Sequence, residues 1–180
     1  GQGGIGLSFT MFASKQGAAE VVGIDKHDYR LEKSISLGAT KSMKFTTLED
    51  LNRQTEEITN GELFDVVVDA SGNKDGFNIC LNLLKPQGKF ITFSIVTEDM
   101  VEFEHSLMLR KNLDIHATQI ATTPQPIDEI RELVALAERG WWDPKSLKTH
   151  VSDLSELQKC YEDYTDQKNN VIKNVLRFNP

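Results

Sequence analysis

A glycine-rich run that leads directly into an apolar segment is the feature that most constrains how this chain can fold. Glycine stands at positions 1, 3, 4 and 6, and apolar residues at helical spacing follow over residues 6–16. Residues 21–24 then form a short apolar run typical of a buried strand, and this run ends at Asp25. Asp25 comes about 20 positions after the glycines, as in turns that hold a phosphate at a helix N-terminus.

Each position of the run has a physical role in such a turn. We expect Gly1 to permit the turn itself and Gly3 to let the backbone approach a pyrophosphate. Gly6 would allow the helix to pack closely against a sheet, and the N–H groups of Gly4 and Ile5 would face the phosphate charge. The run therefore predicts a dinucleotide-binding loop.

Asp25 and the basic residues after it decide which dinucleotide fits. The Asp25 carboxylate would accept hydrogen bonds from ribose hydroxyls and repel a 2′-phosphate, which favours NAD over NADP. Lys26 and Arg30 could reach a 2′-phosphate if Asp25 turned away, or could form a solvated helix face. Two other interpretations stay open: a purely structural turn with Asp25 capping the next helix, and a methyltransferase, whose usual GxGxG pattern fits Gly6 poorly.

Length and charge narrow the class of protein. The chain has 180 residues and a formal net charge of −7, which indicates one domain or one domain with part of another. This acidic balance argues against nucleic acid or an anionic membrane as the main partner. The chain contains no run of about 20 apolar residues that could span a bilayer. Cys80 and Cys160 form neither a disulfide framework nor a zinc pair by their spacing, so we expect packing roles and a cytoplasmic location.

The middle of the chain alternates between strand-like and helix-like segments. This rhythm predicts an α/β fold of the Rossmann type, a doubly wound parallel sheet with helices on both faces. Residues 64–69 are the clearest strand, with the continuous apolar run of a strand covered on both faces. The other expected strands are 43–45, 89–94 and 113–118, and the expected helices are 28–37, 47–60, 75–84, 105–111 and 127–139.

The alternation of apolar strands with helices of about ten residues stops after residues 141–144. A short extended piece near 147–151, a polar helix over 153–165 and a strand over 171–176 do not look like another βαβ unit. This tail is expected to belong to a separate domain. Because the chain opens on a glycine turn with no strand before it, we also expect it to be part of a longer polypeptide.

Six short segments form an ordered set along the chain. They are GQGGIGL (1–7), VGID (22–25), LGAT (37–40), FDVVVDASG (64–72), LKPQGK (84–89) and NVIKNVL (170–176). With Arg30, this set resembles the medium-chain dehydrogenase/reductase family, and within it the zinc-type alcohol and polyol dehydrogenases. The resemblance covers essentially all of the chain.

The resemblance implies an organisation and an activity. Residues 1–140 would be the NAD-binding Rossmann domain without its first strand, and residues 141–180 would return to a GroES-like catalytic domain. The activity would be hydride transfer between an alcohol or polyol and NAD. Zinc and the catalytic residues would lie upstream of the glycine run, so we expect no metal ligands or catalytic residues here and no dehydrogenase activity from this chain alone.

Individual residues match positions of the family. Gly3, Gly4, Ile5 and Gly6 match the pyrophosphate loop, Asp25 the ribose acid and Arg30 the basic residue near the adenosine ribose. Ser71 and Gly72 match a turn close to the cofactor, and Phe93, Ser94 and Ile95 match a strand end that meets the nicotinamide amide. Lys173 matches a basic position that can reach the pyrophosphate. Turn and exposed-strand roles for Ser71 and Lys173 stay equally open.

The remaining predictions concern other ligands and partners. None of the four histidines pairs with a second ligand at metal-binding spacing, so we expect surface or packing roles, although His116 would lie near the nicotinamide pocket by the resemblance. The segment 113–118 is a candidate edge for a homodimer. The alternatives are a zinc-free, NADPH-dependent quinone or enoyl reductase of the same family, and a non-catalytic nucleotide-binding module.

Overall fold

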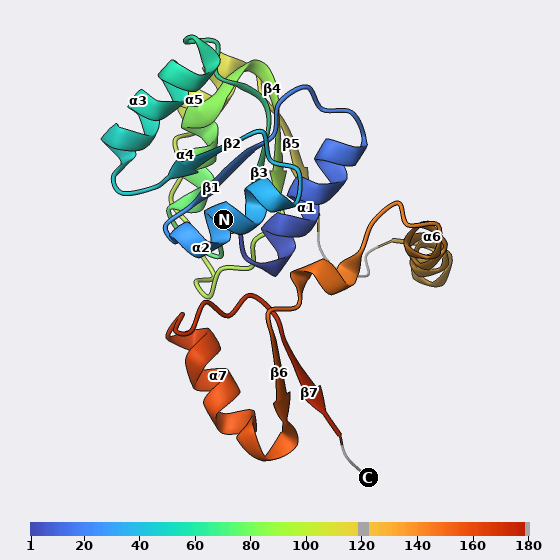
Figure 1. Cartoon of the computed structure of the whole chain (residues 1–180). Helices are drawn as coiled ribbons and strands as arrows, with labels where there is room; N and C mark the ends of the chain where they lie inside the picture. Colours follow the sequence, from blue (N-terminus) through green and yellow to red (C-terminus); the bar gives the residue numbers. More distant parts are fainter. Residues whose placement is uncertain (119–122, 179–180) are drawn as a thin grey trace.

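Helices and strands alternate along most of the chain in the computed structural model, which describes residues 1–118 and 123–178. Figure 1 shows the elements in chain order. The first half contains α1 (Gly4–Lys15), β1 (Val22–Asp25), α2 (Asp28–Ser36), β2 (Lys41–Lys44) and α3 (Leu48–Thr59). It is followed by β3 (Phe64–Asp69), α4 (Gly76–Leu83), β4 (Leu84–Thr92), α5 (His105–Lys111) and β5 (Asp114–Ala117).

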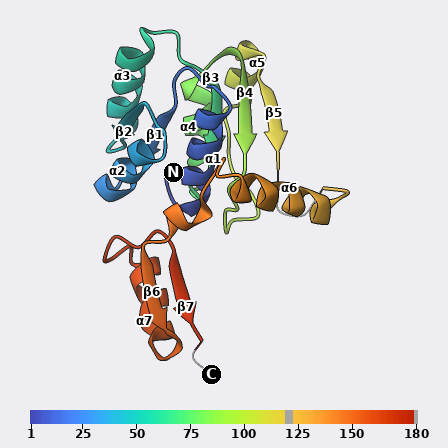
Figure 2. The same cartoon turned by 45° about the vertical axis from the view of Figure 1, so that its right-hand side comes forward.

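The five strands run parallel and carry helices on both faces, as the sequence predicts. Helices α1 and α2 cover one face, and α3, α4 and α5 cover the other (Figure 1). The strands hydrogen-bond in two groups, β1 with β2 and β3–β4–β5 in that order. The carboxyl ends of β4 and β5 point toward the side of the molecule on which the tail lies (Figure 2).

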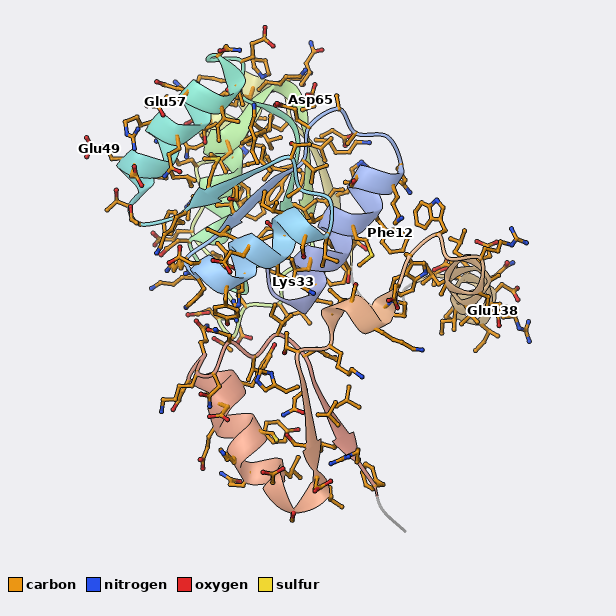
Figure 3. The ribbon with its side chains drawn as sticks, viewed as in Figure 1. Phe12, Lys33, Glu49, Glu57, Asp65 and Glu138 are labelled. Carbon is orange, nitrogen blue, oxygen red and sulfur yellow. The ribbon has the colours of Figure 1, made fainter. Side chains whose placement is uncertain are left out.

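Two apolar clusters hold these layers together. Phe90 of β4 packs with Cys80 and Leu81 of α4, and Met43 of β2 packs with Leu51 of α3 and Leu83 of α4. The polar side of α3 faces away from this core, with Glu49 and Glu57 exposed (Figure 3). Burial of these apolar side chains is the main favourable contribution to such a fold.

Local signals in the sequence set several element ends. The Thr47 hydroxyl accepts a hydrogen bond of 3.1 Å from the Asp50 N–H and caps α3, which confirms the predicted helix start. Gly38 follows α2 with a φ of +111°, a backbone conformation that glycine adopts at little cost.

Strand β4 differs from its prediction. The strand begins at Leu84 rather than at residue 89, and residues 85–88 form an irregularity inside it, because Phe64 pairs with Leu84 whereas Val66 pairs with Lys89. Pro86 has no N–H to donate to the ladder, and Gln87 has a φ of 62°. The strand also ends at Thr92 rather than Ser94, and β2 covers Lys41–Lys44 rather than 43–45.

The sequence predicted that strand β3 is covered on both faces. The structure shows that this coverage is incomplete. Val66 is 51% exposed, whereas Asp69 at the end of the strand is buried. Among the described strands β3 hydrogen-bonds only to β4, so no strand lies bonded along its other edge. Val66 consequently lacks the neighbours that a central strand would provide.

The last part of the chain contains α6 (Pro126–Glu138) and a smaller unit. This unit holds β6 (His150–Asp153), α7 (Leu157–Thr165) and β7 (Asn174–Arg177), with short 3-10 helices at Pro144–Leu147 and Leu154–Glu156. Strands β6 and β7 are hydrogen-bonded in parallel, and α7 connects them along the chain. The expectation that the tail is not a βαβ unit was therefore wrong. The predicted helix 153–165 begins as a 3-10 turn, and the strand predicted over 171–176 covers Asn174–Arg177. Five of the nine residues of α7 are polar or charged and none is buried, so its composition does not predict the crossover helix of a βαβ unit.

Trp141 and Trp142 connect α6 to the α/β layers. Their rings lie 5.1 and 5.4 Å from the ring of Phe12 on α1, and the Trp142 indole N–H donates to the Leu133 carbonyl oxygen at 2.9 Å. Within the described ranges, every helix is too short or too polar to cross a bilayer.

Candidate functional site

The glycine run forms the first turn of α1 and leaves its N-terminus bare. Gly3 is the N-cap residue in extended conformation, no side chain caps the helix, and the first turn holds no acidic residue. A Cβ atom placed on Gly3 or Gly4 would meet nothing within 4 Å. The N–H groups of this turn, including those of Gly4 and Ile5, are therefore free of internal side-chain partners and can receive an anion.

Gly1 and Gly6 hold the loop close to the rest of the chain. A Cβ on Gly6 would lie 1.8 Å from the Gly1 carbonyl oxygen, and a Cβ on Gly1 would lie 2.9 Å from the Ala70 carbonyl oxygen. Both distances are below any ordinary contact, so glycine is required at these positions. Close packing by Gly6 was predicted, but its neighbour is the loop itself rather than the sheet.

Gln2 is a residue whose role the sequence analysis missed. Its side chain is buried, and its Oε1 accepts a hydrogen bond of 2.8 Å from the Thr10 hydroxyl on α1. Its backbone N–H donates to Asp25 Oδ2 at 2.6 Å, which joins the loop to the end of β1. A glutamine between two loop glycines, with a threonine eight residues later in the helix, is the sequence signal that could have indicated this hydrogen bond.

Asp25 receives more partners than any other carboxylate of the candidate site. Its Oδ1 accepts from the backbone N–H and the ring Nδ1 of His27, each at 3.0 Å, and Arg30 Nη1 lies 3.6 Å from Oδ2. Burial alone raises the pKa of Asp25 and is the largest single effect. The bonds from Gln2 and His27, with the charge of Arg30, outweigh burial and leave the pKa below its ordinary value.

The two basic residues near Asp25 both have other contacts. Lys26 Nζ lies 5.3 Å from the centre of the Phe45 ring, and Arg30 Nε donates to the Tyr29 hydroxyl at 3.0 Å. The Arg30 guanidinium also stacks over the Tyr29 ring. In this arrangement Asp25 faces the loop, Lys26 contacts Phe45, and Arg30 contacts both Tyr29 and Asp25.

The turn after β3 meets the end of β4 beside the loop. The Gly72 N–H donates to the Ser94 hydroxyl at 3.0 Å, so two predicted site segments are in direct contact. Asp69 orders them: its Oδ1 accepts from the Ser71 N–H and hydroxyl at 2.9 and 2.7 Å, and its carbonyl oxygen accepts from the N–H groups of Phe93 and Ser94. Asp69 had been taken only as the end of a strand, although a buried acid at the carboxyl end of a parallel strand suggests such a role.

Phe93 and Ile95 flank Ser94 but differ in their surroundings. The Phe93 ring contacts the Phe9 ring edge to face at 5.4 Å, and both line an open, largely apolar cavity of about 380 Å³. His116 lines the same cavity, with its Nε2 3.0 Å from Asp114 Oδ1 on the same strand. Ile95 is exposed. These residues lie at the carboxyl ends of β4 and β5, the usual ligand-binding edge of an α/β sheet.

Lys173 lies just before β7, with an exposed side chain. Its carbonyl oxygen accepts a hydrogen bond of 2.9 Å from the Thr149 N–H, which positions the backbone where β6 begins. Its reach toward a pyrophosphate stays a prediction.

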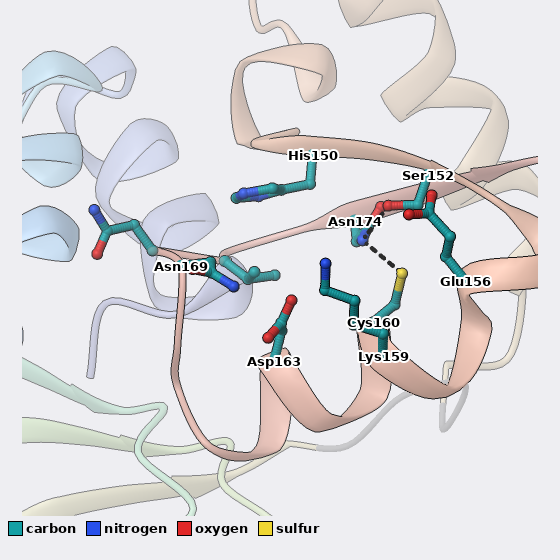
Figure 4. Close-up of a pocket in the computed structure, with 10 residues that line it drawn as sticks. His150, Ser152, Glu156, Lys159, Cys160, Asp163, Asn169 and Asn174 are labelled. Carbon is teal, nitrogen blue, oxygen red and sulfur yellow. Dashed lines mark hydrogen bonds between the residues drawn. The ribbon is translucent and has the colours of Figure 1, made fainter.

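A second cavity, of about 550 Å³, lies between α7 and the strands β6 and β7. Figure 4 shows His150, Lys159 and Asp163 around it. Asn174 donates to the Ser152 hydroxyl at 3.0 Å and to Cys160 Sγ at 3.1 Å, while its own Oδ1 is buried without a partner. This polar cavity belongs to the tail and shares no residue with the glycine loop.

Cys80 does not have the environment of a nucleophile. Burial, assisted by the charge of Asp69, raises the pKa of Cys80 far above its ordinary value, which keeps the thiol protonated. Across residues 1–118 and 123–178, no three His, Cys, Asp or Glu side chains come together as a metal site.

Comparisons with known proteins agree with this geometry. A sequence model of the family described as zinc-binding dehydrogenase matches residues 4–139. An alcohol dehydrogenase of Cupriavidus necator is 27% identical over 98% of this chain and 47% of its own length. An L-threonine 3-dehydrogenase of Chromobacterium violaceum is 36% identical over 89% of this chain and 46% of its own length.

The solved structures agree on the fold. An alcohol dehydrogenase from E. coli CFT073 in complex with NADH superposes with a TM-score of 0.84 at 21% identity, over 99% of this chain and 50% of that one. The chain thus spans about half the length of the relatives that it matches.

Proposed function

Because the chain belongs to the zinc-binding dehydrogenase family, we propose that it is the NAD-binding part of an alcohol or polyol dehydrogenase. The observation that carries this proposal is the hydrogen bond from the Gln2 N–H to Asp25 beside the open positions Gly3 and Gly4. It places a bare helix N-terminus beside a carboxylate at the carboxyl end of β1, as in dinucleotide-binding folds. The NADH bound by the E. coli relative supports the choice of cofactor.

The residues of the site have separable tasks. The N–H groups of Gly4 and Ile5 hold the pyrophosphate, for which Gly3 leaves room, and Asp25 holds the adenosine ribose. The residues proposed to position the nicotinamide are Ser71, Gly72, Phe93, Ser94 and Ile95. Lys173 is proposed to reach the pyrophosphate from the tail. When bound, NAD accepts the hydride that an alcohol carbon releases.

We propose NAD rather than NADP because of the charges around the ribose position. The Asp25 carboxylate would repel a 2′-phosphate, and its lowered pKa keeps it charged. Lys26 is engaged with Phe45, and Arg30 with Tyr29 and with Asp25 itself. A preference for NADPH would instead favour a zinc-free reductase of the same family.

The remainder of the activity is proposed to reside in the half of such enzymes that this chain does not span. The zinc ligands and most substrate-binding residues would lie there, with residues 1–140 as the cofactor domain and 141–180 as a return to the catalytic domain. Alcohol, threonine and sorbitol dehydrogenases among the relatives support a small polar alcohol or polyol as the substrate.

Two further proposals concern assembly and location. β5 is an edge strand among the described strands, so pairing of its free edge with a second copy would give a dimer. Both cysteines are free, and this supports the cytoplasm as the location.

Replacement of Gly3 tests the proposed site directly. The added side chain of Gly3→Val would enter open space at the helix N-terminus, so the fold should be kept while the pyrophosphate is excluded. Calorimetric titration should show NADH affinity lowered at least about ten-fold, or 1.4 kcal/mol. Ala18→Val, which also introduces a valine, but at an exposed position beyond the other end of α1, should bind like the wild type.

Two results would contradict the proposal. One is unchanged NADH binding by a folded Gly3→Val variant. The other is binding of S-adenosylmethionine, but not NADH, by the wild-type chain, which would indicate a methyltransferase.

A further inference from the structure

Three hydrogen bonds and one ion pair surround the Asp25 carboxylate, where a ribose hydroxyl is proposed to bind. A carboxylate offers about four lone-pair positions, two on each oxygen. Oδ1 accepts from the N–H and Nδ1 of His27, and Oδ2 accepts from the Gln2 N–H and faces Arg30. The hydrogen bonds thus fill three of the four positions, and the Arg30 guanidinium lies 3.6 Å from the oxygen that holds the fourth.

The same carboxylate is also hidden from solvent. The Asp25 side chain is 4% exposed, because the side chains of His27 and Arg30 lie over it. Of these two, His27 is the more accessible, at 32% against 15% for Arg30. Access to the carboxylate thus depends on movement of one of two covering side chains.

His27 is held less firmly than the other partners. Arg30 is hydrogen-bonded to the Tyr29 hydroxyl and stacked on its ring. The backbone of Gln2 is held in place because the Gln2 side chain is hydrogen-bonded to Thr10. The His27 ring has one hydrogen bond, from Nδ1 to Asp25, and a tilted contact with Tyr29 at 5.7 Å between centroids. His27 is the N-cap residue of α2 in extended conformation, so its ring can turn while its backbone N–H stays bonded to Asp25.

We propose that the His27 imidazole is a gate on Asp25: it occupies the acceptor position that a ribose hydroxyl takes, and cofactor binding displaces it. This inference rests on the proposed function, since it concerns the ribose of a bound dinucleotide. Asp25 is ionised and can only accept, so the gate requires the His27 tautomer that carries its proton on Nδ1. His27 thereby lowers cofactor affinity by one hydrogen bond that must be broken.

Titration of NADH into the wild type and two variants tests the gate. His27→Ala removes the ring bond but keeps the backbone bond to Asp25, and its NADH dissociation constant should fall about five-fold. His27→Asn returns an N–H donor near the position of Nδ1 and should bind like the wild type. Unchanged or weaker binding by His27→Ala would overturn the gate.

A measurement on the wild type alone keeps the proposal testable if the alanine variant does not fold. The long-range ¹H–¹⁵N NMR spectrum of the His27 ring should show a protonated Nδ1 that shifts when NADH is added. A ring signal unaffected by saturating NADH would refute the gate and leave the proposed function standing. Absence of NADH binding by the folded wild-type chain would overturn both.

Discussion

At the scale of single residues, the glycines of the loop differ in what surrounds them. Gly3 and Gly4 face open space, whereas Gly6 faces the carbonyl oxygen of Gly1. The first pair leaves room for a ligand, and Gly6 holds the shape of the loop. Glycine is therefore needed at these positions for two different reasons: room for a ligand at Gly3 and Gly4, and folding of the loop at Gly6.

Substitution of Gly6 should accordingly affect stability. A Cβ 1.8 Å from the Gly1 carbonyl oxygen forces the backbone to shift, so Gly6→Ala should lower the free energy of unfolding by about 2 kcal/mol. Gly4→Ala, with no neighbour within 4 Å, should be neutral or slightly stabilising because alanine favours a helix. Urea denaturation of both variants measures the difference, and equal stability of the two would show that the loop is not packed as described.

The acid dependence of stability should report on Asp25. A carboxylate whose pKa is lowered by folding stabilises the native state above its unfolded pKa, near 4, and loses this effect as pH falls through the folded value. The stability difference between the wild type and Asp25→Asn should therefore shrink when the pH is lowered from about 6 to about 3. Thermal unfolding at several pH values measures it. A constant difference over this range would contradict the hydrogen bonding described for Asp25.

At the scale of elements, Lys111 at the end of α5 stabilises the junction of α4 and β4. Its Nζ donates to the carbonyl oxygens of Leu81, Asn82 and Leu84 at 2.9, 2.9 and 2.6 Å, which uses all three ammonium protons. Burial lowers its pKa, partly offset by Glu104. Carbonyl groups at a helix C-terminus have no partner within the helix, so this lysine supplies one from a distant segment.

Replacement of Lys111 by methionine keeps the aliphatic stem and removes the three hydrogen bonds. We expect the free energy of unfolding to fall by about 2 kcal/mol, since bonds from a charged donor are stronger than neutral ones. Arg110→Met, at the exposed neighbouring position, should change it by less than about 0.5 kcal/mol. Chemical denaturation separates the two, and equal effects of both variants would contradict the role of Lys111.

The reach of sequence reasoning differs between elements and side-chain contacts. The glycine loop, the acid at the end of β1 and the alternation of helices and strands follow from local spacing, and they could be predicted. The His27 ring on Asp25, the Asp69 bonds to Ser71 and the Lys111 bonds depend on the direction in which side chains point, which spacing does not encode.

At the scale of the whole molecule, the candidate site is assembled from segments far apart in the sequence. The loop at residues 1–6, the end of β1, the turn after β3 and the end of β4 meet through the bonds of Gln2 to Asp25 and of Gly72 to Ser94. The βαβ arrangement of the tail was missed because α7 is mostly polar and has no buried residue. Pairing between strands that are far apart in the sequence, such as β6 with β7, is seen only in the structure.

The preference between NADH and NADPH tests the central claim most directly, because it depends on the whole assembled ribose position. Parallel calorimetric titrations of the chain should give a dissociation constant for NADH at least about ten-fold lower than that for NADPH, a difference of 1.4 kcal/mol. This result would agree with a charged Asp25 facing the ribose. Equal affinities, tighter binding of NADPH, or no binding of either by a folded chain would contradict the account.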